Sequence, residues 1–308
     1  MTRTPVDPTG QQIRLTRGDV TAHISQVGAA LRGLAVGGTA IVPPYPEGAM
    51  APSGSGVVLV PWPNRVRDGR WRAVDPHGRA YDEQLAIDEV PRRNAIHGLL
   101  RWTAYEVDEG DGSVTLSARI LPRRGYPFAL DTRVTYALAD DGIRVTHEIE
   151  NIGADAAPVG VGTHPFLFIE GVATEDLVLA VPAETFFEVD DRLLPVAESP
   201  VSGSVDLRGG VRVGDAQLDT AFGGLRRDAD GRARATLTAP DGRVLALWQD
   251  EAFDFLQVFT TSSYPGQSRA VAVEPMTMPA DALNSGQGLR WVEPGETWSA
   301  SWGVALGR

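Results

Sequence analysis

His164 is the residue whose surroundings best suit a ligand. It lies in Pro158–Phe168, which alternates as a β-strand does and places Gly160, Gly162 and His164 on one face. Two glycines at strand spacing leave open space beside the imidazole, where a ligand could approach the backbone. The alternative is a packed histidine next to Pro165, which would end the strand. Both interpretations stay open on these residues alone.

Glu274 repeats this arrangement on a second segment. In Arg269–Pro279, Val271 and Val273 point to one face, whereas two alanines and Glu274 point to the other. Pro275 follows directly and would stop the ladder of backbone hydrogen bonds there. A carboxylate on a face of small side chains suits acid–base chemistry. The alternative is an ordinary surface glutamate at the end of a strand.

Three further polar residues stand in short segments that could face a ligand. Gly98 follows His97 and indicates a tight turn that would present the imidazole. Arg65 comes after Trp62 and two prolines, and a pre-set backbone with an aromatic ring and a guanidinium suits sugar binding. Asp219 carries a weaker signal, since a lone aspartate is more often solvated or caps a turn. A structural role stays open for all three.

The remaining histidines are interpreted as structural. His147 shares strand parity with Val145, which indicates a core or half-buried position. His77 lies in the turn-like segment Asp75–Gly78, and His23 lies in a strand-like segment near the N-terminus.

The composition removes several kinds of chemistry. The 308 residues include no cysteine and no lysine, so neither a thiolate nucleophile nor a lysine Schiff base can form. Phosphate-binding loops, dinucleotide fingerprints and the His-Glu-x-x-His motif are missing too. His97 and His164 could join a carboxylate around a metal ion, but no local spacing supports this, and we expect no metal. The net charge of −12 disfavours nucleic acid and anionic membranes as partners.

The sequence also gives no targeting or membrane signal. Met1–Gly10 lacks the apolar stretch of a signal peptide. Apolar runs such as Val57–Val60 and Val244–Trp248 are far shorter than the roughly 20 residues that span a bilayer. We therefore expect a cytoplasmic protein without a membrane partner.

Strand patterns run through most of the chain and would position these residues. Val134, Tyr136 and Leu138 alternate with smaller residues before a turn at Asp140–Gly142, and the alternation resumes at Ile143, which predicts a hairpin. Further turns are predicted at Asp68-Gly69, Asp111-Gly112, Asp230-Gly231 and Asp241-Gly242.

So many turns favour an all-β sandwich or barrel. Only Arg79–Glu89 offers a weak helix candidate. The Gly- and Pro-rich stretches Gly37–Pro52 and Pro200–Gly214 are too short and too apolar for linkers, and no fixed-period repeat is visible. We expect one large β domain over residues 1–308.

Five segments together resemble the aldose 1-epimerase (mutarotase) family. Each is weak alone, but they follow one another in the family's order and extend over most of the chain. They are Pro61-Trp-Pro-Asn-Arg65, Ile96-His-Gly98, Gly162-Thr-His-Pro-Phe166, Leu218-Asp-Thr-Ala-Phe222 and Val273-Glu-Pro-Met-Thr-Met-Pro-Ala-Asp-Ala-Leu-Asn284.

The resemblance implies a large antiparallel β-supersandwich of the galactose-mutarotase-like kind and an enzyme that needs no cofactor. By motif, Glu274 matches the family's general base and His164 its general acid, and His97 matches the second histidine of the site. The residues matched to sugar binding are Arg65, Asp219 and Asn64. The partner implied is a small-molecule sugar, and the protein is expected to be a monomer or a homodimer.

The implied reaction opens a cyclic hemiacetal and closes it on the other face. A free Glu carboxyl is ionised at neutral pH, and an imidazole is about one quarter protonated at pH 7. A neighbouring carboxylate raises the protonated fraction, so we expect Glu274 as carboxylate and His164 as imidazolium.

Three alternatives are kept. The segment His164-Pro-Phe has phenylalanine where many galactose mutarotases have tyrosine, which leaves the sugar open. The same reaction could act on a phosphorylated or sulfonated hexose, with an arginine such as Arg67 binding the anionic group. A glycosidase would pair Glu274 with a second carboxylate and leave His164 without a role. A non-catalytic carbohydrate-binding domain would need Arg65 and Asp219 but neither member of the acid–base pair.

Overall fold

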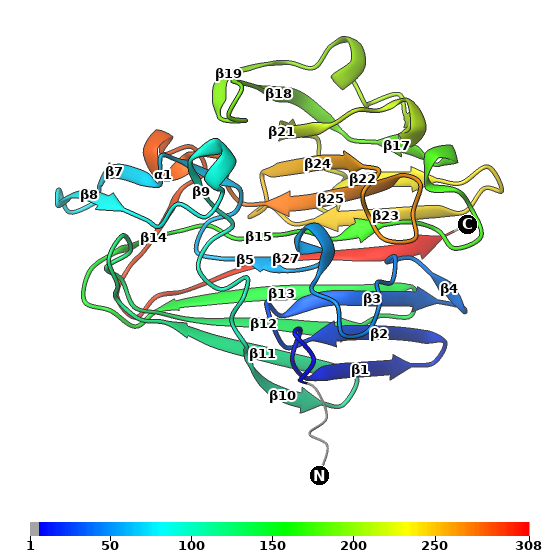
Figure 1. Ribbon diagram of the computed structural model, residues 1–308, viewed down its shortest axis with the longest axis horizontal. Coiled ribbons are helices and arrows are strands. Elements are labelled where there is room, and N and C mark those ends of the chain that lie inside the picture. Colours follow the sequence, from blue (N-terminus) through cyan, green and yellow to red (C-terminus); the bar gives the residue numbers. More distant parts are fainter. Residues whose placement is uncertain (1–5, 308) are drawn as a thin grey trace.

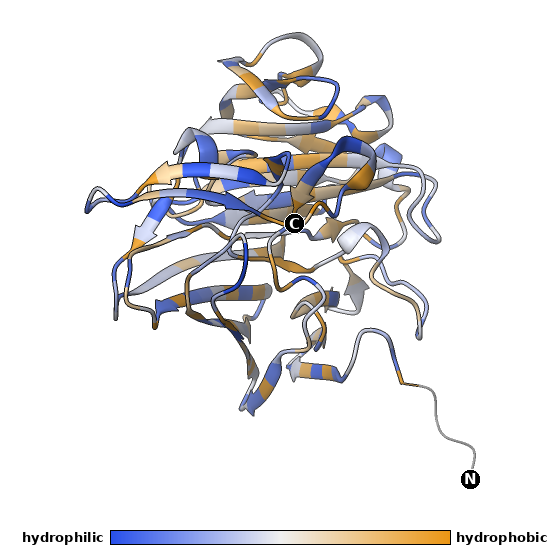
Figure 2. Cartoon of the chain, turned by 60° about the vertical axis from the view of Figure 1, so that its left-hand side comes forward, coloured by the Kyte–Doolittle hydropathy of each residue, from blue (hydrophilic) through white to orange (hydrophobic). Residues whose placement is uncertain are grey.

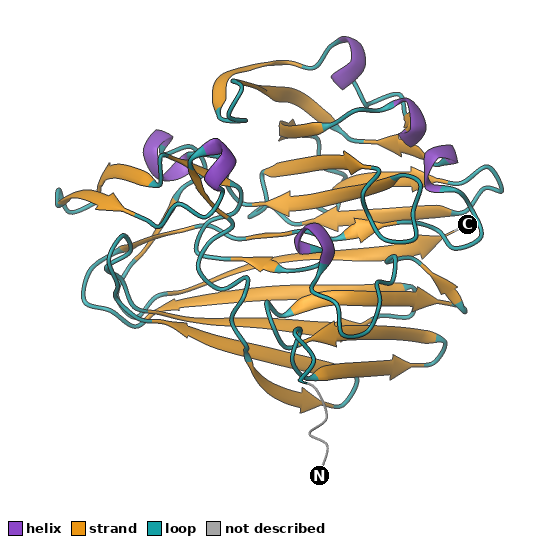
Figure 3. Ribbon diagram, viewed as in Figure 1, coloured by secondary structure: helices purple, strands orange, loops and turns teal. Residues whose placement is uncertain are grey.

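The computed structural model describes residues 6–307 and consists almost entirely of antiparallel strands (Figures 1 and 3). Strands make up 49 % of the described residues and helices 6 %, which confirms the predicted all-β supersandwich fold. The predicted domain covers residues 1–308, and residues 1–5 and 308 lie outside the described part of the chain. The first five residues of the segment Met1–Gly10 are among them.

Two large sheets organise the molecule. The first has nine strands, and its longest members, β12, β13 and β27, run side by side across the lower half of Figure 1. In spatial order the strands are β10 (Glu106–Gly110), β11 (Ser113–Ile120), β12 (Leu130–Leu138), β13 (Gly142–Asn151), β27 (Thr297–Gly307), β23 (Val244–Gln249), β22 (Ala233–Thr238), β17 (Val178–Ala180) and β20 (Val211–Arg212).

The second sheet has eight strands, three of which are only two residues long. In spatial order they are β19 (Pro195–Pro200), β18 (Ala183–Val189), β21 (Asp219–Leu225), β24 (Phe255–Thr261), β25 (Ala270–Met276), β15 (Gly162–Thr163) and β5 (Val58–Leu59), and β16 (Phe166–Leu167) also pairs with β25.

Smaller sheets complete the fold, and the N-terminal one packs against β12 and β13. They are β1 (Gln12–Arg17) with β2 (Val20–Ser25), β3 (Ala30–Val36) and β4 (Thr39–Ala40); β6 (Arg65–Arg67) with β9 (Asn94–Ile96); β7 (Arg70–Val74) with β8 (Ala80–Gln84); and β14 (Ala157–Val159) with β26 (Arg290–Val292). The helical turns are α1 (Ala282–Ser285), η1 (Pro52–Gly54), η2 (Val90–Arg92), η3 (Thr174–Asp176), η4 (Gly203–Val205) and η5 (Val213–Asp215).

Period-two patterning accounts for the long strands. Along β12 and β13, buried and more accessible residues alternate, so one face of each strand packs in the core. Figure 2 shows the same alternation as hydrophobic and hydrophilic bands along several strands. The main hydrophobic cluster draws on both large sheets and includes Trp302 and Phe222, which are fully buried. Apolar burial of this kind is the main force that stabilises a stack of sheets.

The predicted turns are confirmed. Each of the five Asp- and Gly-containing turns lies between strands that are consecutive in the chain, and the predicted hairpin at Asp140–Gly142 joins β12 to β13. The weak helix candidate Arg79–Glu89 does not form a helix. Strand β8 occupies Ala80–Gln84 and pairs with β7, because its residues alternate and Tyr81 is buried against Trp71.

The strand prediction for Pro158–Phe168 is correct only in part. The segment forms three short strands, β14, β15 and β16, and His164 lies in the gap between the last two. The predicted open space beside the glycines is absent: a Cβ at Gly160 would meet the Met278 side chain at 2.6 Å, and one at Gly162 would meet Pro63 at 2.7 Å. These glycines allow close packing and do not make room for a ligand.

Within residues 6–307, no helix is long and apolar enough to cross a membrane.

Candidate active site

A cavity of about 190 Å³ lies over the eight-stranded sheet, and all six residues proposed from the sequence line it. They come from segments more than 200 positions apart in the chain. Three residues that the sequence did not single out complete the wall. The lining residues are Asn64, Arg65, His97, His164, Asp219 and Glu274, together with Ser53, Gln257 and Phe259.

Glu274 and His164 face each other at the bottom of the cavity. The Oε1 atom of Glu274 lies 3.4 Å from Nε2 of His164, and the exposed fractions of the two side chains are 3 % and 7 %. Strand β25 holds Glu274 opposite Gln257 of β24. The backbone of His164 is fixed by a hydrogen bond donated to the carbonyl of Val57, and its ring stacks on Phe166 with centroids 5.3 Å apart.

Burial works against charge on both members of this pair. Burial lowers the pKa of His164 to about 4. Burial also raises the pKa of Glu274 well above its usual value, the nearby carboxylate of Asp219 adds to the effect, and Arg65 opposes it. Both shifts in pKa favour the uncharged forms of the two side chains over the expected carboxylate–imidazolium pair.

His97 is presented by the predicted turn. Its φ angle is +65°, and its backbone N–H donates to the carbonyl of Asn64 at 2.8 Å. The next residue has to be glycine, because a Cβ at Gly98 would lie 2.2 Å from the carbonyl oxygen of Val60. The ring of His97 meets that of His164 edge-on, with centroids 5.7 Å apart.

His97 carries a neutral imidazole. Burial, and then the neighbouring His164 and Arg101, lower the pKa of His97 well below its usual value. Among the described residues, no hydrogen-bond partner reaches its buried Nδ1 atom. A neutral ring at the cavity wall can either donate to a sugar hydroxyl or accept from one.

A chain of polar contacts links Asn64, Gln257 and Asp219 in the cavity wall. Asn64 donates from Nδ2 to Oε1 of Gln257 at 3.2 Å, and Gln257 donates from Nε2 to Oδ1 of Asp219 at 2.6 Å. Arg65 donates from Nη1 to Oδ1 of Asn64 at 3.4 Å, and its Nη2 atom lies 3.9 Å from Oδ2 of Asp219. Carboxylate, amide and guanidinium groups in one wall suit a ligand rich in hydroxyl groups.

Sequence reasoning missed Gln257, Ser53 and Phe259. Gln257 lies on a strand without any local motif, and only its pairing opposite Glu274 brings it to the cavity. Ser53 directly follows the Gly- and Pro-rich stretch Gly37–Pro52, in η1, with a φ angle of +50°. Gln257 could not be found without knowing which strands are neighbours.

The other three histidines lie outside the cavity. His147 is buried and accepts a hydrogen bond from Nε1 of Trp302 at 3.0 Å. His77 is exposed and pairs with Glu293 at 2.8 Å, and half-buried His23 lies in the N-terminal sheet. Over the described part of the chain, no three His, Cys, Asp or Glu side chains gather closely enough to hold a metal ion.

Known proteins share this architecture. The structure is similar to that of a galactose mutarotase-like protein from Clostridium acetobutylicum, with a TM-score of 0.83 and 20 % identity over 96 % of this chain and 95 % of that one. It is also similar to a galactose 1-epimerase from Lactobacillus acidophilus, with a TM-score of 0.79 and 19 % identity over 96 % and 94 % of the two chains. At these identities the likeness establishes the fold.

Sequence comparison establishes the family. An uncharacterised protein of Escherichia coli, YihR, is 34 % identical over 291 residues, which cover 93 % of this chain and 90 % of that protein. The sequence profile of the aldose 1-epimerase family matches residues 11–304. That range contains every residue of the cavity, and the chain therefore belongs to the aldose 1-epimerase family.

Proposed function

We propose that this protein is an aldose 1-epimerase that interconverts the α- and β-anomers of a free aldohexose. The observation that carries the proposal is the contact between Glu274 and His164. A carboxyl group and an imidazole lie 3.4 Å apart, both almost fully buried, in a cavity whose other lining residues include polar groups able to bind hydroxyls. Ring opening of a hemiacetal requires one base and one acid acting on neighbouring oxygens, and this pair supplies both.

In the first half of the reaction the ring opens. Glu274, as carboxylate, removes the proton from the anomeric O1, and His164, as imidazolium, donates a proton to the ring oxygen O5. The C1–O5 bond breaks, its electron pair stays on O5, and C1 becomes an aldehyde carbon. The pair then holds its proton on Glu274, which is the protonation state that burial favours.

In the second half the ring closes on the other face. Rotation about C1–C2 turns the aldehyde over, and O5 attacks C1 while His164 takes the O5 proton back. Glu274 returns its proton to O1, so the pair regains its starting state and no net proton is consumed.

The form of the pair that starts the reaction differs by one proton transfer from the uncharged form that burial favours. Both forms of the pair carry zero net charge, and they differ only in whether Glu274 or His164 holds the proton. A sugar hydroxyl that donates to Glu274, together with the positive charge of Arg65, stabilises the carboxylate and favours the form that begins the reaction.

The polar wall would hold the sugar in place. His97, Arg65 and Asp219 can bind hydroxyl groups. The hydrogen bonds from Asn64 to Gln257 and from Gln257 to Asp219 fix the orientation of the Asp219 carboxylate. Phe259 provides an apolar surface for the C–H face of the ring.

The size of the cavity weighs against a glycosidase. About 190 Å³ is below the roughly 300–1,000 Å³ typical of sites for drug-sized ligands, so the cavity suits one monosaccharide rather than two linked sugars. The second carboxylate, Asp219, is already bound by Gln257. A binding-only domain would have no use for the buried pair of Glu274 and His164.

An anionic hexose is the second candidate substrate, and Arg67 is the residue that would bind its charged group. Arg67 lies two residues from Arg65 on β6 and is 39 % exposed, beside the cavity rather than in its wall. Its guanidinium contacts Asp190 and Asp281 at 3.4 Å each, so its charge is partly compensated. A phosphate or sulfonate group that extends from the ring would have to compete with these carboxylates.

Proton NMR of the anomeric signals tests the proposal. Freshly dissolved α-D-glucose and α-D-galactose are followed at neutral pH with and without the protein, and then a phosphorylated and a sulfonated hexose are followed in the same way. Faster approach to the anomeric equilibrium with any of these sugars supports an epimerase, and the ranking of rates identifies the substrate class. Rates equal to the protein-free control for all four sugars would reject the proposal.

A further inference from the structure

Glu89 lies outside the lining of the cavity and makes the shortest polar contacts of the Arg65 side chain. The Nε atom of Arg65 donates to both carboxylate oxygens of Glu89, at 3.1 and 3.0 Å. The side chains of both residues are only 11 % exposed. Within the cavity, the contacts of Arg65 with Asn64 and Asp219 are longer, at 3.4 and 3.9 Å.

The loop around η2 is built to hold this carboxylate. Asn94 donates from Nδ2 to Glu89 at 2.9 Å, and Arg92 donates from Nη1 at 3.2 Å. Burial alone would raise the pKa of Glu89, but the hydrogen bonds from Arg65 and Asn94 outweigh it and lower the pKa. Glu89 is therefore a fixed anion at neutral pH.

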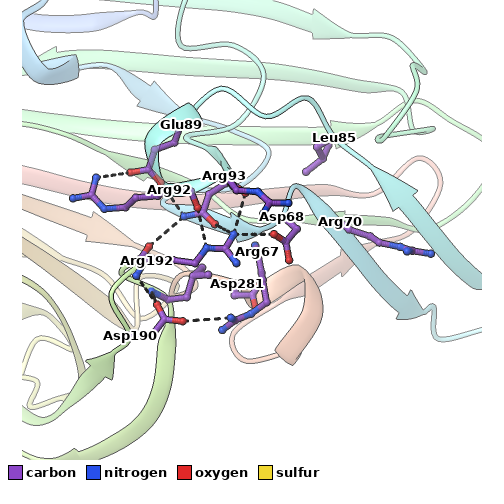
Figure 4. Close-up of polar contacts among 12 residues, drawn as sticks. Arg67, Asp68, Arg70, Leu85, Glu89, Arg92, Arg93, Asp190, Arg192 and Asp281 are labelled. Carbon is purple, nitrogen blue, oxygen red and sulfur yellow. Dashed lines mark hydrogen bonds and ion pairs between the residues drawn. The ribbon is translucent and has the colours of Figure 1, made fainter.

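A second arginine ties this loop to a distant hairpin. Figure 4 shows Arg192, from the connection between β18 and β19, reaching the loop that carries Arg92 and Arg93. Its Nε atom donates to the carbonyl of Arg92 at 2.9 Å, and its Nη2 atom donates to Oδ1 of Asn94 at 3.0 Å. The loop that holds Glu89 is thus anchored from outside the cavity.

The shape of a guanidinium explains why this anchor matters. Its five N–H donors are fixed in one plane, so binding Nε to Glu89 decides where the two terminal nitrogens point. They point into the cavity, toward Asn64 and Asp219. Without Glu89, the nearest carboxylate for Arg65 would be Asp219, and direct pairing with it would remove both groups from sugar binding.

We propose that Glu89 is a positioning residue: it holds the guanidinium of Arg65 in the orientation that binds sugar hydroxyls and keeps it from pairing with Asp219. The role rests on the proposed function, because Arg65 is taken to bind the sugar. Glu89 itself touches neither the sugar nor the reacting atoms.

The kinetic test uses Glu89→Ala and Glu89→Gln. Loss of Glu89 weakens binding of the sugar in the ground state and in the transition state by the same amount. We therefore expect KM for the sugar to rise about tenfold in Glu89→Ala, while kcat stays within about threefold of the wild type. Glu89→Gln keeps one acceptor oxygen and should give a KM between that of the wild type and that of Glu89→Ala. The matched control is Asp82→Asn, which removes an exposed bidentate partner of Arg70 and should change neither constant.

A second measurement does not depend on turnover. In protein labelled with ¹⁵N-arginine, the Nε–H signal of Arg65 is identified by its disappearance in Arg65→Lys. We expect slow hydrogen exchange of this proton in the wild type, and exchange at least about tenfold faster in Glu89→Gln, because its acceptor is weakened.

The outcomes separate the two proposals. If the wild type fails to accelerate anomer exchange but the Arg65 proton still loses its protection in Glu89→Gln, the proposed function fails and the anchor stands. If the wild type is active and neither KM nor the protection changes in the Glu89 variants, the positioning role is rejected. Thermal melting shows whether each variant is folded, and Glu89→Gln serves if Glu89→Ala is not.

Discussion

Two buried histidines, one within the nine-stranded sheet and one between two short strands of the eight-stranded sheet, differ in what surrounds them. His147 lies in the middle of β13, a regular strand of ten residues, opposite Val134 on one side and Ala300 on the other. Its Nε2 atom accepts from the indole of Trp302, and Phe253 packs edge-on against the ring. His164 lies between two strands of two residues each and faces Glu274 across the cavity floor.

The difference shows how a fold separates packing from chemistry. In a continuous strand the neighbours on both sides fill the space around a side chain, so a buried polar group must be satisfied from within. Where the strands are interrupted, the backbone of His164 is held by Val57 and Gly56, and its ring is free to meet a ligand. Burial lowers the pKa of both histidines, and only their surroundings separate the two roles.

Removing the base should have the largest effect. Glu274→Gln keeps the shape of the cavity but cannot take the O1 proton, so the rate of anomer exchange should fall by about 10²–10⁴-fold, with sugar affinity within about tenfold. Exchange spectroscopy between the two anomeric protons measures the rate.

The matched control for this variant is Glu293→Gln. Glu293 pairs with His77 at 2.8 Å on the surface, so it repeats the same pair of side chains outside the cavity. Exchange at the wild-type rate in Glu274→Gln would overturn the assigned role of that residue.

Truncating the core histidine should act on stability instead. His147→Ala leaves a cavity and strips Trp302 of its acceptor, which should cost about 3 kcal/mol of the free energy of unfolding. Turnover of the folded variant should stay within about threefold of the wild type. Urea denaturation and NMR exchange measure the two quantities. If His147→Ala has normal stability but no longer accelerates anomer exchange, His147 acts in the reaction and the structural role assigned to it is wrong.

Acid should destabilise the folded protein through buried His147. The folded protein binds a proton at His147 only below a pKa of about 3, whereas an unfolded histidine binds one below about 6.5. Stability therefore falls as the pH drops from about 6.5 to about 3, and His147→Gln should weaken that dependence. Denaturation midpoints at several pH values test this expectation.

The pH dependence of the rate should follow the active-site pair. Below a pKa of about 4, His164 gains a proton while Glu274 keeps its own, so no base remains. Above the raised pKa of Glu274 the pair loses its single proton, so no acid remains. The exchange rate should be bell-shaped and fall about tenfold per pH unit on each side. A rate that declines already between pH 6.5 and 5 would contradict this assignment.

The smallest effect is expected at an exposed ion pair of the nine-stranded sheet. Asp131 binds Arg119 through two short hydrogen bonds, much as Glu89 binds Arg65, but it lies among accessible side chains. Asp131→Asn should move the melting temperature by no more than about 2 °C and leave KM unchanged. A change in KM at Asp131 as large as at Glu89 would mean that burial does not distinguish the two pairs.

The parts of the fold with a regular period could be predicted from the sequence. Strict alternation from Val134 to Leu138 and from Ile143 onward, with Asp-Gly chemistry between them, predicts β12 and β13 correctly. The same rule failed at Arg79–Glu89, where alternation over only five residues is hard to distinguish from a turn of helix. It failed in part around His164, where the segment divides into three short strands and its glycines pack closely against Met278 and Pro63.

The site could be predicted where residue type and local motif agree, and not where only register decides. Glu274, His164, His97 and Arg65 stand in recognisable segments. Gln257 reaches the cavity because β24 pairs with β25, and Glu89 reaches Arg65 because the loop after β8 folds back on β6. Neither pairing leaves a trace in the local sequence, since the partners lie 17 and 24 positions apart.

In the sequence, the tight turn at Asp140–Gly142 separates the lining residues of the cavity into two groups. A chain cut at this turn could therefore report on the association of its two fragments. A chain cut there yields one fragment with Asn64, Arg65 and His97 and another with the acid–base pair. Neither fragment could turn over sugar, because one lacks the groups that move protons and the other lacks half of the groups that hold the ring. The fragments would meet along the long edge between β12 and β13. Anomer exchange would then measure reassembly of the two halves.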